Sequence, residues 1–381
     1  MIMHGDLPPV GHKISLQAST ENTLVNFLGG HQYWVDSGTS ALALAILDAK
    51  TRFPAVHKPR VIIPGYCCPD LVAACIYAGV EPVAVDIGID DPAYDLERLR
   101  VHLDEHVVAV IAVNFLGIAE RLSELRQLIY SLGLSTKLIE DNAQWFPAQQ
   151  ADAATNSDYT VFSFGRGKPL SLFGGGLLRA NTALNDVIIQ KIDVAAAYST
   201  ISSLKVRAYN VLLQPQFYFL LNRNPLFQLG ETKYRALEKI QATDAWRLSL
   251  VSENFERYVG RESMLPAHYD DVVIKNGMQQ LSIATQVRRK QLLRYPLLCA
   301  NSGQRDELLV KMRKHGLGAT AMYAASIDQI AGMEGLVSVP TPIVNAQQFA
   351  RRFITLPVHA GVTRVYREKI VMLLQHAGQS D

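Results

Sequence analysis

The sequence predicts an α/β protein, in which a large domain with a mostly parallel sheet wrapped by helices precedes a smaller α+β domain. From Ser37 to about Arg179, short apolar runs alternate with stretches of helical periodicity, a pattern typical of such a sheet. Long helical stretches follow, and from about Gly260 short strands mix with amphipathic helices. A chain of 381 residues is long enough for two domains. We therefore expect a large domain at 1–250 and a small one at 251–381.

The predicted strands are short runs of apolar and β-branched residues that turn residues separate. Between them lie segments whose apolar residues recur at helical spacing. Strands that alternate with helices in this way favour a parallel sheet. In chain order the predicted strands are Val61–Pro64, Pro82–Asp86, Val107–Asn114, Lys137–Asp141, Thr160–Phe164 and Gly176–Arg179, and the predicted helices are Ser40–Lys50, Asp70–Ala78 and Ser123–Leu132.

Three later segments have helical patterns. The aromatic-rich segment Lys205–Leu229 is interrupted by prolines, and we favour core or subunit-interface packing for it, with a position on a membrane surface as the alternative. A second helical pattern covers Tyr234–Val259. The basic run Val287–Tyr295 is typical of a solvated helix face, and phosphate binding by Arg288 or Arg289 is the alternative.

The composition is that of a compact soluble protein, with 49% hydrophobic and 19% charged residues. A formal net charge of +2 argues against a protein built mainly to bind nucleic acid. The first residues lack a signal-peptide core, and no window reaches the ~18 apolar residues that suggest a membrane span. The four cysteines have neither a metal-type spacing nor the density of a disulfide scaffold. We expect a cytoplasmic protein with reduced thiols.

A glycine and three hydroxyl residues follow the strand-like segment Tyr33–Val35 and precede an Ala/Leu-rich helix. They are Ser37, Gly38, Thr39 and Ser40. The first turn of a helix presents free backbone N–H groups and the positive end of the helix dipole, which together suit a phosphate. An ordinary helix cap made by Ser37 or Thr39 is the alternative.

Asp141 ends the predicted strand Lys137–Asp141 and is followed closely by Gln144. Ligands of open parallel sheets bind beyond the carboxyl ends of the strands, so this acid points toward the expected cleft. A carboxylate there could hold a metal, act as a base or pair with a protonated ring nitrogen. A helix cap is again the structural alternative.

Lys168 lies in the turn that follows the next predicted strand. The turn is no Walker phosphate loop, because Pro169 follows the lysine and Phe162 occupies the place of the required first glycine. A partly desolvated lysine is a nucleophile that can form a Schiff base. Pyridoxal phosphate requires such a lysine, a carboxylate for its pyridine nitrogen and an anion site for its phosphate. Lys168, Asp141 and the Ser37–Ser40 turn supply all three.

With these residues in place, the chain resembles the DegT/DnrJ/StrS aminotransferases, which use pyridoxal phosphate in the fold type I shared with aspartate aminotransferase. The resemblance covers nearly the whole chain, and the order of its motifs is more specific than any one of them. The motifs are SGTSALALA, RVIIPGYCCPDLVAACIYAGVEPVAVDI, IEDNAQ, VFSFGRGKPLSLFGGGLL and ITLPVHAGVT.

The resemblance implies a role for each matching residue. Lys168 would be the catalytic lysine that binds the cofactor covalently, Asp141 would pair with the pyridine nitrogen, and Gln144 would lie near the ring hydroxyl. Cys68 takes the place of the aromatic residue that stacks on the ring in many members, and a thiol or Tyr66 would have to serve instead. The phosphate would be held by Gly38, Thr39, Ser40 and Ser163.

The resemblance also implies an activity in a homodimer. It is transfer of an amino group from an amino acid, with glutamate as the expected donor, to a keto-sugar that we expect to be nucleotide-linked, in cell-surface polysaccharide or amino-sugar biosynthesis. Two departures concern the substrate. The loop after the lysine has lost its acid and reads Phe173–Gly176, and the motif that members lend to the neighbouring subunit reads GETKYR, without its asparagine. A pyridoxal-phosphate enzyme of another reaction class, or a cofactor-binding relative without activity, therefore remains an alternative.

Overall fold

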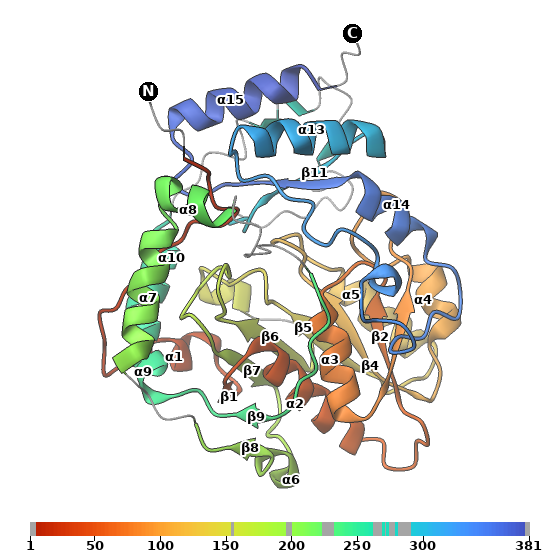
Figure 1. The fold of residues 1–381 in the computed structure, drawn as a ribbon. Helices are drawn as coiled ribbons and strands as arrows, with labels where there is room; N and C mark the ends of the chain where they lie inside the picture. Colours follow the sequence, from red (N-terminus) through yellow and green to blue (C-terminus); the bar gives the residue numbers. More distant parts are fainter. Residues whose placement is uncertain are drawn as a thin grey trace.

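The described part of the chain forms two lobes, one above the other in Figure 1. The computed structural model describes residues 5–153, 156–195, 200–222, 232–261, 269–270, 272–273, 279–280 and 291–377. A large sheet and its helices make the lower lobe, and the last strands and helices of the chain make the upper one.

Seven described strands form the large sheet, in the order β1-β7-β6-β5-β4-β2-β3. Neighbouring strands are parallel from β3 to β6, whereas β7 is antiparallel to both of its neighbours. The fold class predicted from the sequence is therefore confirmed. The strands are β1 (His31–Val35), β2 (Arg60–Pro64), β3 (Glu81–Val85), β4 (Val107–Val113), β5 (Lys137–Asp141), β6 (Tyr159–Ser163) and β7 (Gly176–Ala180).

The six predicted strands correspond to β2 through β7, with ends that differ by at most one residue. β4 shows why these strands could be predicted from the sequence. Its residues are buried on both faces of the sheet, so the strand is a continuous run of Val, Ala and Ile. β1, the strand-like segment before Ser37, pairs with β7 at one edge. The pairing of Ser163 with Gly176 makes the Lys168 segment a loop between two hydrogen-bonded strands.

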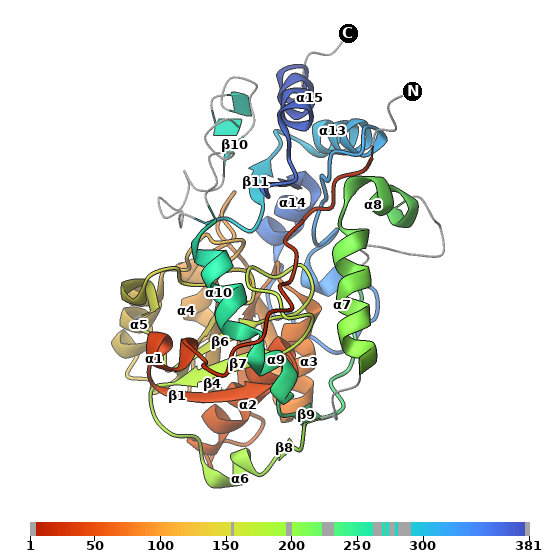
Figure 2. The same ribbon diagram turned by 90° about the vertical axis from the view of Figure 1, so that its left-hand side faces the viewer.

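Helices cover both faces of the sheet (Figures 1 and 2). α2 (Gly38–Thr51) and α3 (Pro69–Ala78) pack together on one face, and α4 (Leu96–His102) and α5 (Leu122–Ser131) on the other. The three predicted helices are confirmed as α2, α3 and α5. α2 is buried almost all round, because it lies between the sheet and α3.

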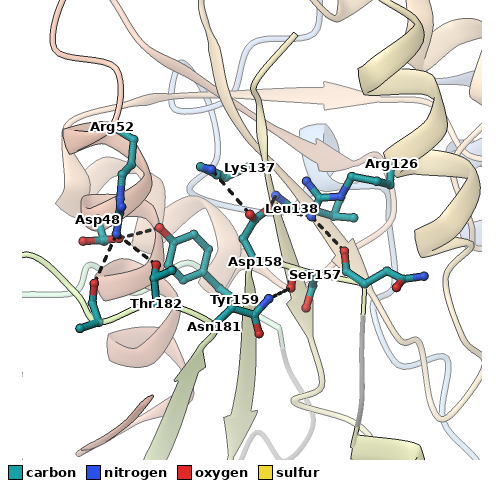
Figure 3. Close-up of polar contacts among 12 residues, drawn as sticks. Asp48, Arg52, Arg126, Lys137, Leu138, Ser157, Asp158, Tyr159, Asn181 and Thr182 are labelled. Atoms are coloured by element: carbon teal, nitrogen blue, oxygen red, sulfur yellow. Dashed lines mark hydrogen bonds and ion pairs between the residues drawn. The ribbon is translucent and has the colours of Figure 1, made fainter. Parts of the chain in front are cut away.

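A buried carboxylate ties α2 to the sheet (Figure 3). Asp48 accepts hydrogen bonds from the Tyr159 hydroxyl at 2.6 Å, Arg52 Nη2 at 3.0 Å and the backbone N–H of Asn185 at 2.9 Å. Its side chain is completely buried. Because Tyr159 begins β6, these bonds fix the helix relative to the strand that leads into the Lys168 loop.

The upper lobe contains a three-stranded antiparallel sheet of β10 (Gln279–Gln280), β11 (Tyr295–Leu298) and β12 (Phe353–Leu356). α13 (Ser302–Lys314) and α15 (Arg364–Gln375) pack on it, and α14 (Val344–Arg352) leads into β12. Leu7, from the other end of the chain, is buried in this same core and donates its backbone N–H to Gly316 O at 2.7 Å. The domain boundary at 250/251 stays a prediction.

The segment Lys205–Leu229 begins with α7 (Thr200–Leu212) and α8 (Pro215–Asn222), and its last seven residues lie outside the described part. α7 packs inward through the buried Val206 and through Tyr209, whose ring lies 5.3 Å from that of Phe173 in an edge-to-face contact. The predicted packing role is thus confirmed for this helix. The remaining described helices are α1 (Leu24–Leu28), α6 (Asp186–Ile189), α9 (Ala245–Ser249) and α10 (Val251–Val259), and β8 (Ile192–Asp193) pairs with β9 (Ile240–Gln241).

Two predictions after α8 are wrong. The helical pattern of Tyr234–Val259 forms helix only from Ala245 onward, because the residues before it run as an extended segment into β9. In the basic run, residues 291–295 are not helical, and Leu292 and Leu293 are buried. Arg288 and Arg289 lie outside the described residues. No described helix is long and apolar enough to cross a membrane.

Candidate active site

A cavity of about 220 Å³ lies at the carboxyl edge of the large sheet. The strands bring its walls together, because β1, β4, β5 and β6 all end beside it. Among the predicted site residues, seven line this cavity: Gly38, Thr39, Cys68, Asp141, Gln144, Ser163 and Lys168. Ser40 is completely buried and lies beneath the wall instead.

The turn before α2 has the features of an anion site. Ser37 caps the helix, since its Oγ accepts the N–H of Ser40 at 3.0 Å. The Ser40 hydroxyl is itself fixed by a 2.7 Å bond to Asp36 Oδ1, so it supports the turn rather than facing the cavity. The N–H groups of Gly38 and Thr39, in the first turn, have no acceptor within the helix. The predicted cap and the predicted phosphate site are therefore compatible.

Two glycines allow this turn to approach the neighbouring strands. A Cβ at Gly38 would lie 2.7 Å from Ser163 Cβ, and one at Gly176 would lie 2.1 Å from the carbonyl oxygen of Ser37. Real Cβ atoms do not come so close, so a side chain at either position would displace the strand or the turn. The Ser163 hydroxyl and the first turn of α2 consequently face one small volume, as a phosphate group requires.

Asp141 lies on the opposite wall, where β5 ends. The residue is 6% exposed, and its Oδ1 accepts the backbone N–H of Ala143 at 2.8 Å. Burial raises the pKa of this carboxyl, and the positive charge of Lys168 counteracts the rise. A buried carboxylate with little other compensation suits a positively charged partner, such as the protonated nitrogen of a pyridine ring.

Lys168 is held by its backbone rather than by its side chain. Gly167 has a φ of 70°, and the N–H of Lys168 points back to Gly165 O at 3.4 Å. The Tyr209 hydroxyl of α7 lies near the backbone of Gly167. Within the described part of the chain, the lysine ammonium has no hydrogen bond or ion pair, so it is available to a bound group.

Gln144 and Tyr323 form a pair that the sequence did not reveal. Gln144 Oε1 accepts the N–H of Leu116 at 2.9 Å, and its Nε2 donates to the Tyr323 hydroxyl at 2.7 Å. Both side chains line the cavity. Tyr323 lies 179 residues after Gln144, in a segment without periodic pattern, so no sequence signal connects the two.

Cys68 and Tyr66 have different positions, and only one of them is available to a ring in the cavity. Cys68 lines the cavity at the start of α3, and burial raises the pKa of its thiol to about 12, so it is uncharged. Tyr66 is absent from the cavity wall; it is buried in a cluster of aromatic rings and donates its hydroxyl to Tyr323 O at 3.0 Å. The option that Tyr66 serves as the stacking residue is therefore wrong.

The loop that has lost its acid, Phe173–Gly176, closes the cavity beside Lys168. Gly174 and Gly175 line the wall, and a Cβ at Gly174 would come within 3.1 Å of Arg247 Nε. Phe173 has a φ of 64°, which a residue other than glycine rarely adopts. Gly230, the first residue of the GETKYR motif, lies outside the described residues.

The cavity fits pyridoxal phosphate in three respects. One end offers N–H groups and a hydroxyl for a phosphate, the far wall offers a buried carboxylate for a ring nitrogen, and Lys168 stands free between neighbouring loops. A metal does not fit as well, because the described residues contain no group of three or more potential ligands from His, Cys, Asp and Glu.

Comparison with known proteins agrees with this geometry. The model of the DegT/DnrJ/EryC1/StrS aminotransferase family matches residues 16–375. A dTDP-3-amino-3,4,6-trideoxy-alpha-D-glucose transaminase from Micromonospora megalomicea is 30% identical over 148 residues, which are 38% of each chain. A UDP-4-amino-4,6-dideoxy-N-acetyl-beta-L-altrosamine transaminase from Campylobacter jejuni is 22% identical over 347 residues, covering 89% of this chain and 83% of the relative.

The fold is also shared with solved structures. The crystal structure of NtdA from Bacillus subtilis, with bound cofactor PMP, superposes with a TM-score of 0.67 at 14% identity, over 94% of this chain and 76% of that one. This chain matches the first relative over only 38% of that relative's length, so the relative's reaction is not assigned to this protein on that match. The family match, by contrast, runs through both lobes. The chain belongs to the DegT/DnrJ/EryC1/StrS aminotransferase family.

Proposed function

We propose that the protein is a pyridoxal-phosphate-dependent aminotransferase that moves an amino group from an amino acid, with glutamate as the expected donor, to a nucleotide-linked keto-sugar. The observation that carries the proposal is the meeting of Lys168, Asp141 and the Gly38–Thr39 turn around one cavity. The names of the relatives support the acceptor class, since they are transaminases of dTDP- and UDP-linked sugars. The pathway class we propose is cell-surface polysaccharide or amino-sugar biosynthesis.

In this proposal Lys168 has two tasks. Its amine would hold the cofactor, and the same amine, once free, would take a proton from the substrate carbon that bears nitrogen. When bound, pyridoxal phosphate supplies an electron sink that makes this proton acidic enough to remove. A positioned base of this kind typically contributes ~10²- to 10⁴-fold to the rate. Both tasks require an amine that no other side chain holds, and among the described residues the Lys168 amine, which lines the cavity, has no hydrogen bond or ion pair.

The other residues hold the ring. Asp141 would keep the ring nitrogen protonated, and its burial would strengthen that interaction because few other groups compete for its charge. Gly38, Thr39 and Ser163 would bind the phosphate. Gln144, fixed by Tyr323, would bind the ring hydroxyl, and the Cys68 thiol would take the place of a stacking side chain.

A homodimer and a cytoplasmic location belong to the same proposal. The dimer is supported by the family, whose members build the active site between two subunits, and by large apolar side chains on α7 and α8 that are exposed in the single chain.

The test is a single half-reaction. Protein loaded with pyridoxal phosphate is mixed with glutamate without any acceptor, and 2-oxoglutarate is measured per subunit. We expect about one equivalent from wild type and from the control Lys311→Ala, a surface lysine paired with Glu307, and none from Lys168→Ala.

The visible absorption of the lysine-bound cofactor separates the other outcomes. If no absorption band forms, Lys168 is a structural turn residue and the enzyme proposal fails. If the band forms but glutamate yields no 2-oxoglutarate, the cofactor site stands and the donor or the reaction class is wrong. A stable, unreactive band with every amino donor would identify a cofactor-binding relative without activity.

A further inference from the structure

A second and larger cavity, of about 660 Å³, lies between the two lobes. Its walls come from the N-terminal segment Pro8–Lys13, the end of α7, the end of α10 and the segment Val358–Gly361. This volume lies within the range of small-molecule sites, which is roughly 300–1,000 Å³.

The charge of this cavity is one-sided. Three cationic side chains line it, those of Lys13, Arg257 and Arg261, whereas no Asp or Glu occurs among its described lining residues. Apolar groups such as Leu213 and Tyr258 make up much of the remaining wall. A site with several cations and an apolar wall suits an organic anion.

Arg261 is the most informative of these residues, because it is partly buried and has no counter-ion among the described residues. Its Nη1 donates to the carbonyl oxygen of Pro169 at 2.7 Å, and its guanidinium lies 5.3 Å from the Tyr258 ring. It has no carboxylate partner within the described part of the chain. Burial lowers the pKa of Arg261 to about 10, so it is still charged at neutral pH. A buried charge is normally paired, and here an anionic ligand would pair it.

The two histidines of the cavity are neutral and lie beside its cationic side chains. Burial, and after it the charge of Arg261, lower the pKa of His12 to about 3. His359 contacts Pro8 O through Nε2 at 2.8 Å and accepts the N–H of Gly361 on Nδ1 at 3.1 Å, which requires a neutral ring. Neither ring therefore neutralises an anion, and that task remains with the arginines and Lys13.

The cavity adjoins the lysine turn. Pro169, whose carbonyl oxygen accepts the Arg261 bond, directly follows Lys168 and lines the second cavity, while Lys168 lines the first. The arginine that would bind the ligand is thus hydrogen-bonded to the residue that directly follows the lysine.

From this geometry we propose that the cavity binds an oxyanion on an organic body, a phosphate or a carboxylate, through Arg261, with Arg257 and Lys13 as outer contacts. The site exists whether or not the protein is an aminotransferase. The conclusion that its ligand is a substrate, held beside Lys168, rests on the proposed function.

Calorimetric titration of the cofactor-treated full chain tests the site without any turnover. Pyrophosphate and glutarate serve as probes, since neither carries an amine or a ketone, and their relative affinities tell a phosphate site from a carboxylate site. We expect Arg261→Met to weaken binding of the preferred probe at least ~10-fold, the loss of one charged contact. Arg257→Met should weaken it less. Arg364→Met, on an exposed arginine paired with Glu368, should leave it unchanged.

A second variant separates loss of the anion site from misfolding of Arg261→Met. Leu213→Trp fills the cavity from the opposite wall and leaves Arg261 in place, and we expect it to abolish binding. Unchanged binding in both Arg261→Met and Leu213→Trp would overturn the proposal, as would wild type that binds neither probe. Because the visible cofactor band is recorded on the same samples, loss of anion binding and failure of the cofactor proposal are told apart.

Discussion

Tyr323 shows how one hydroxyl connects the upper lobe to the candidate active site. It accepts the Gln144 amide at 2.7 Å, while its carbonyl oxygen accepts the Tyr66 hydroxyl at 3.0 Å. Gln144 is thereby held on both sides, by Tyr323 and by the N–H of Leu116. Tyr323 is a positioning residue, since it would act on the cofactor through Gln144.

We therefore expect Tyr323→Phe to lower kcat roughly 2- to 10-fold, the equivalent of one neutral hydrogen bond. The absorption spectrum of the bound cofactor should shift in its pH dependence, which a purely structural role would not cause. Steady-state kinetics and pH titration of the spectrum check this. The control is Tyr269→Phe, which also removes a buried tyrosine hydroxyl, in this case one that donates to a backbone carbonyl oxygen. Equal changes in both variants would contradict the positioning role.

Glu120 is a buried carboxyl behind the sheet edge. It accepts the backbone N–H groups of Tyr94 at 3.1 Å and Arg121 at 2.8 Å, and burial raises its pKa to about 7. An acid whose pKa is raised by folding adds to the unfolding free energy at pH values below its unfolded-state pKa of ~4.5. This contribution is lost as the pH rises through 7.

The expected loss between those pH values is about 3 kcal/mol of unfolding free energy, because one pKa unit corresponds to ~1.4 kcal/mol. Urea unfolding of wild type and Glu120→Gln at pH 5 and pH 8 measures it. The variant should lose less stability than wild type over this interval. Parallel pH dependences in the two proteins would show that Glu120 ionises normally.

Most of the site was predictable residue by residue, because its residues have local signatures. Lys168 follows a strand and lies among glycines, Asp141 ends a strand, and Gly38 precedes a helix. The structure then places these three residues around one cavity. Tyr323 and Arg261 had no such signature, since each acquires its neighbours only through the packing of the two lobes. Their surroundings are tertiary, and a single sequence does not encode them in any local pattern.

At the scale of elements, the contact of α2 with β6 depends on the buried Asp48. Its hydrogen bonds to Tyr159 and Arg52 connect the start of the strand and the helix (Figure 3), and a third bond connects the N–H of Asn185. Since α2 carries the proposed phosphate turn at its other end, the same contact keeps that turn in place.

Asp48→Asn should lower the unfolding free energy by about 2–3 kcal/mol, because it removes a charged acceptor and faces an amide toward buried donors. Arg52→Met removes only the partner that is 39% exposed and should cost less than ~1 kcal/mol. Chemical unfolding of both variants measures the difference. If the two losses are equal, the Asp48 network contributes no more than an ordinary surface ion pair.

Elements were predictable where their pattern was long or fully buried. β4 and α2 are examples, as continuous apolar runs of strand and helix length. The helix predicted before Ala245 is absent because residues 232–239 are extended and lead into β9. Tertiary contacts therefore outweigh their helix propensity. α4 was missed because only Leu99 among its residues is buried, which leaves little periodicity to detect.

At the scale of the whole molecule, the exposed apolar residues of α7 and α8 bear on assembly. Leu204 is 66% exposed and Leu220 is 62% exposed, although the helices otherwise pack inward. Exposed apolar side chains on adjoining helices are typical of a protein interface. This surface is our candidate for the dimer contact.

Light scattering should give a mass about twice the 42.1 kDa of one chain. Leu204→Glu combined with Leu220→Glu should shift the mass toward one chain at low concentration. Val310→Glu, at a residue of α13 that is 65% exposed, is the control and should not. A dimer that persists unchanged in the double variant would place the interface elsewhere.

The joining of the two chain ends in the upper lobe has a consequence for synthesis. Leu7 packs against residues around Gly316, which the ribosome adds 309 residues later. At ~5–20 residues per second, that interval is roughly 15–60 s. During this time the sheet lobe can assemble while the first residues have no place to dock. The upper core, and with it Tyr323, is completed late in translation, so the nascent chain acquires a full cofactor cavity only when nearly all of it has been made.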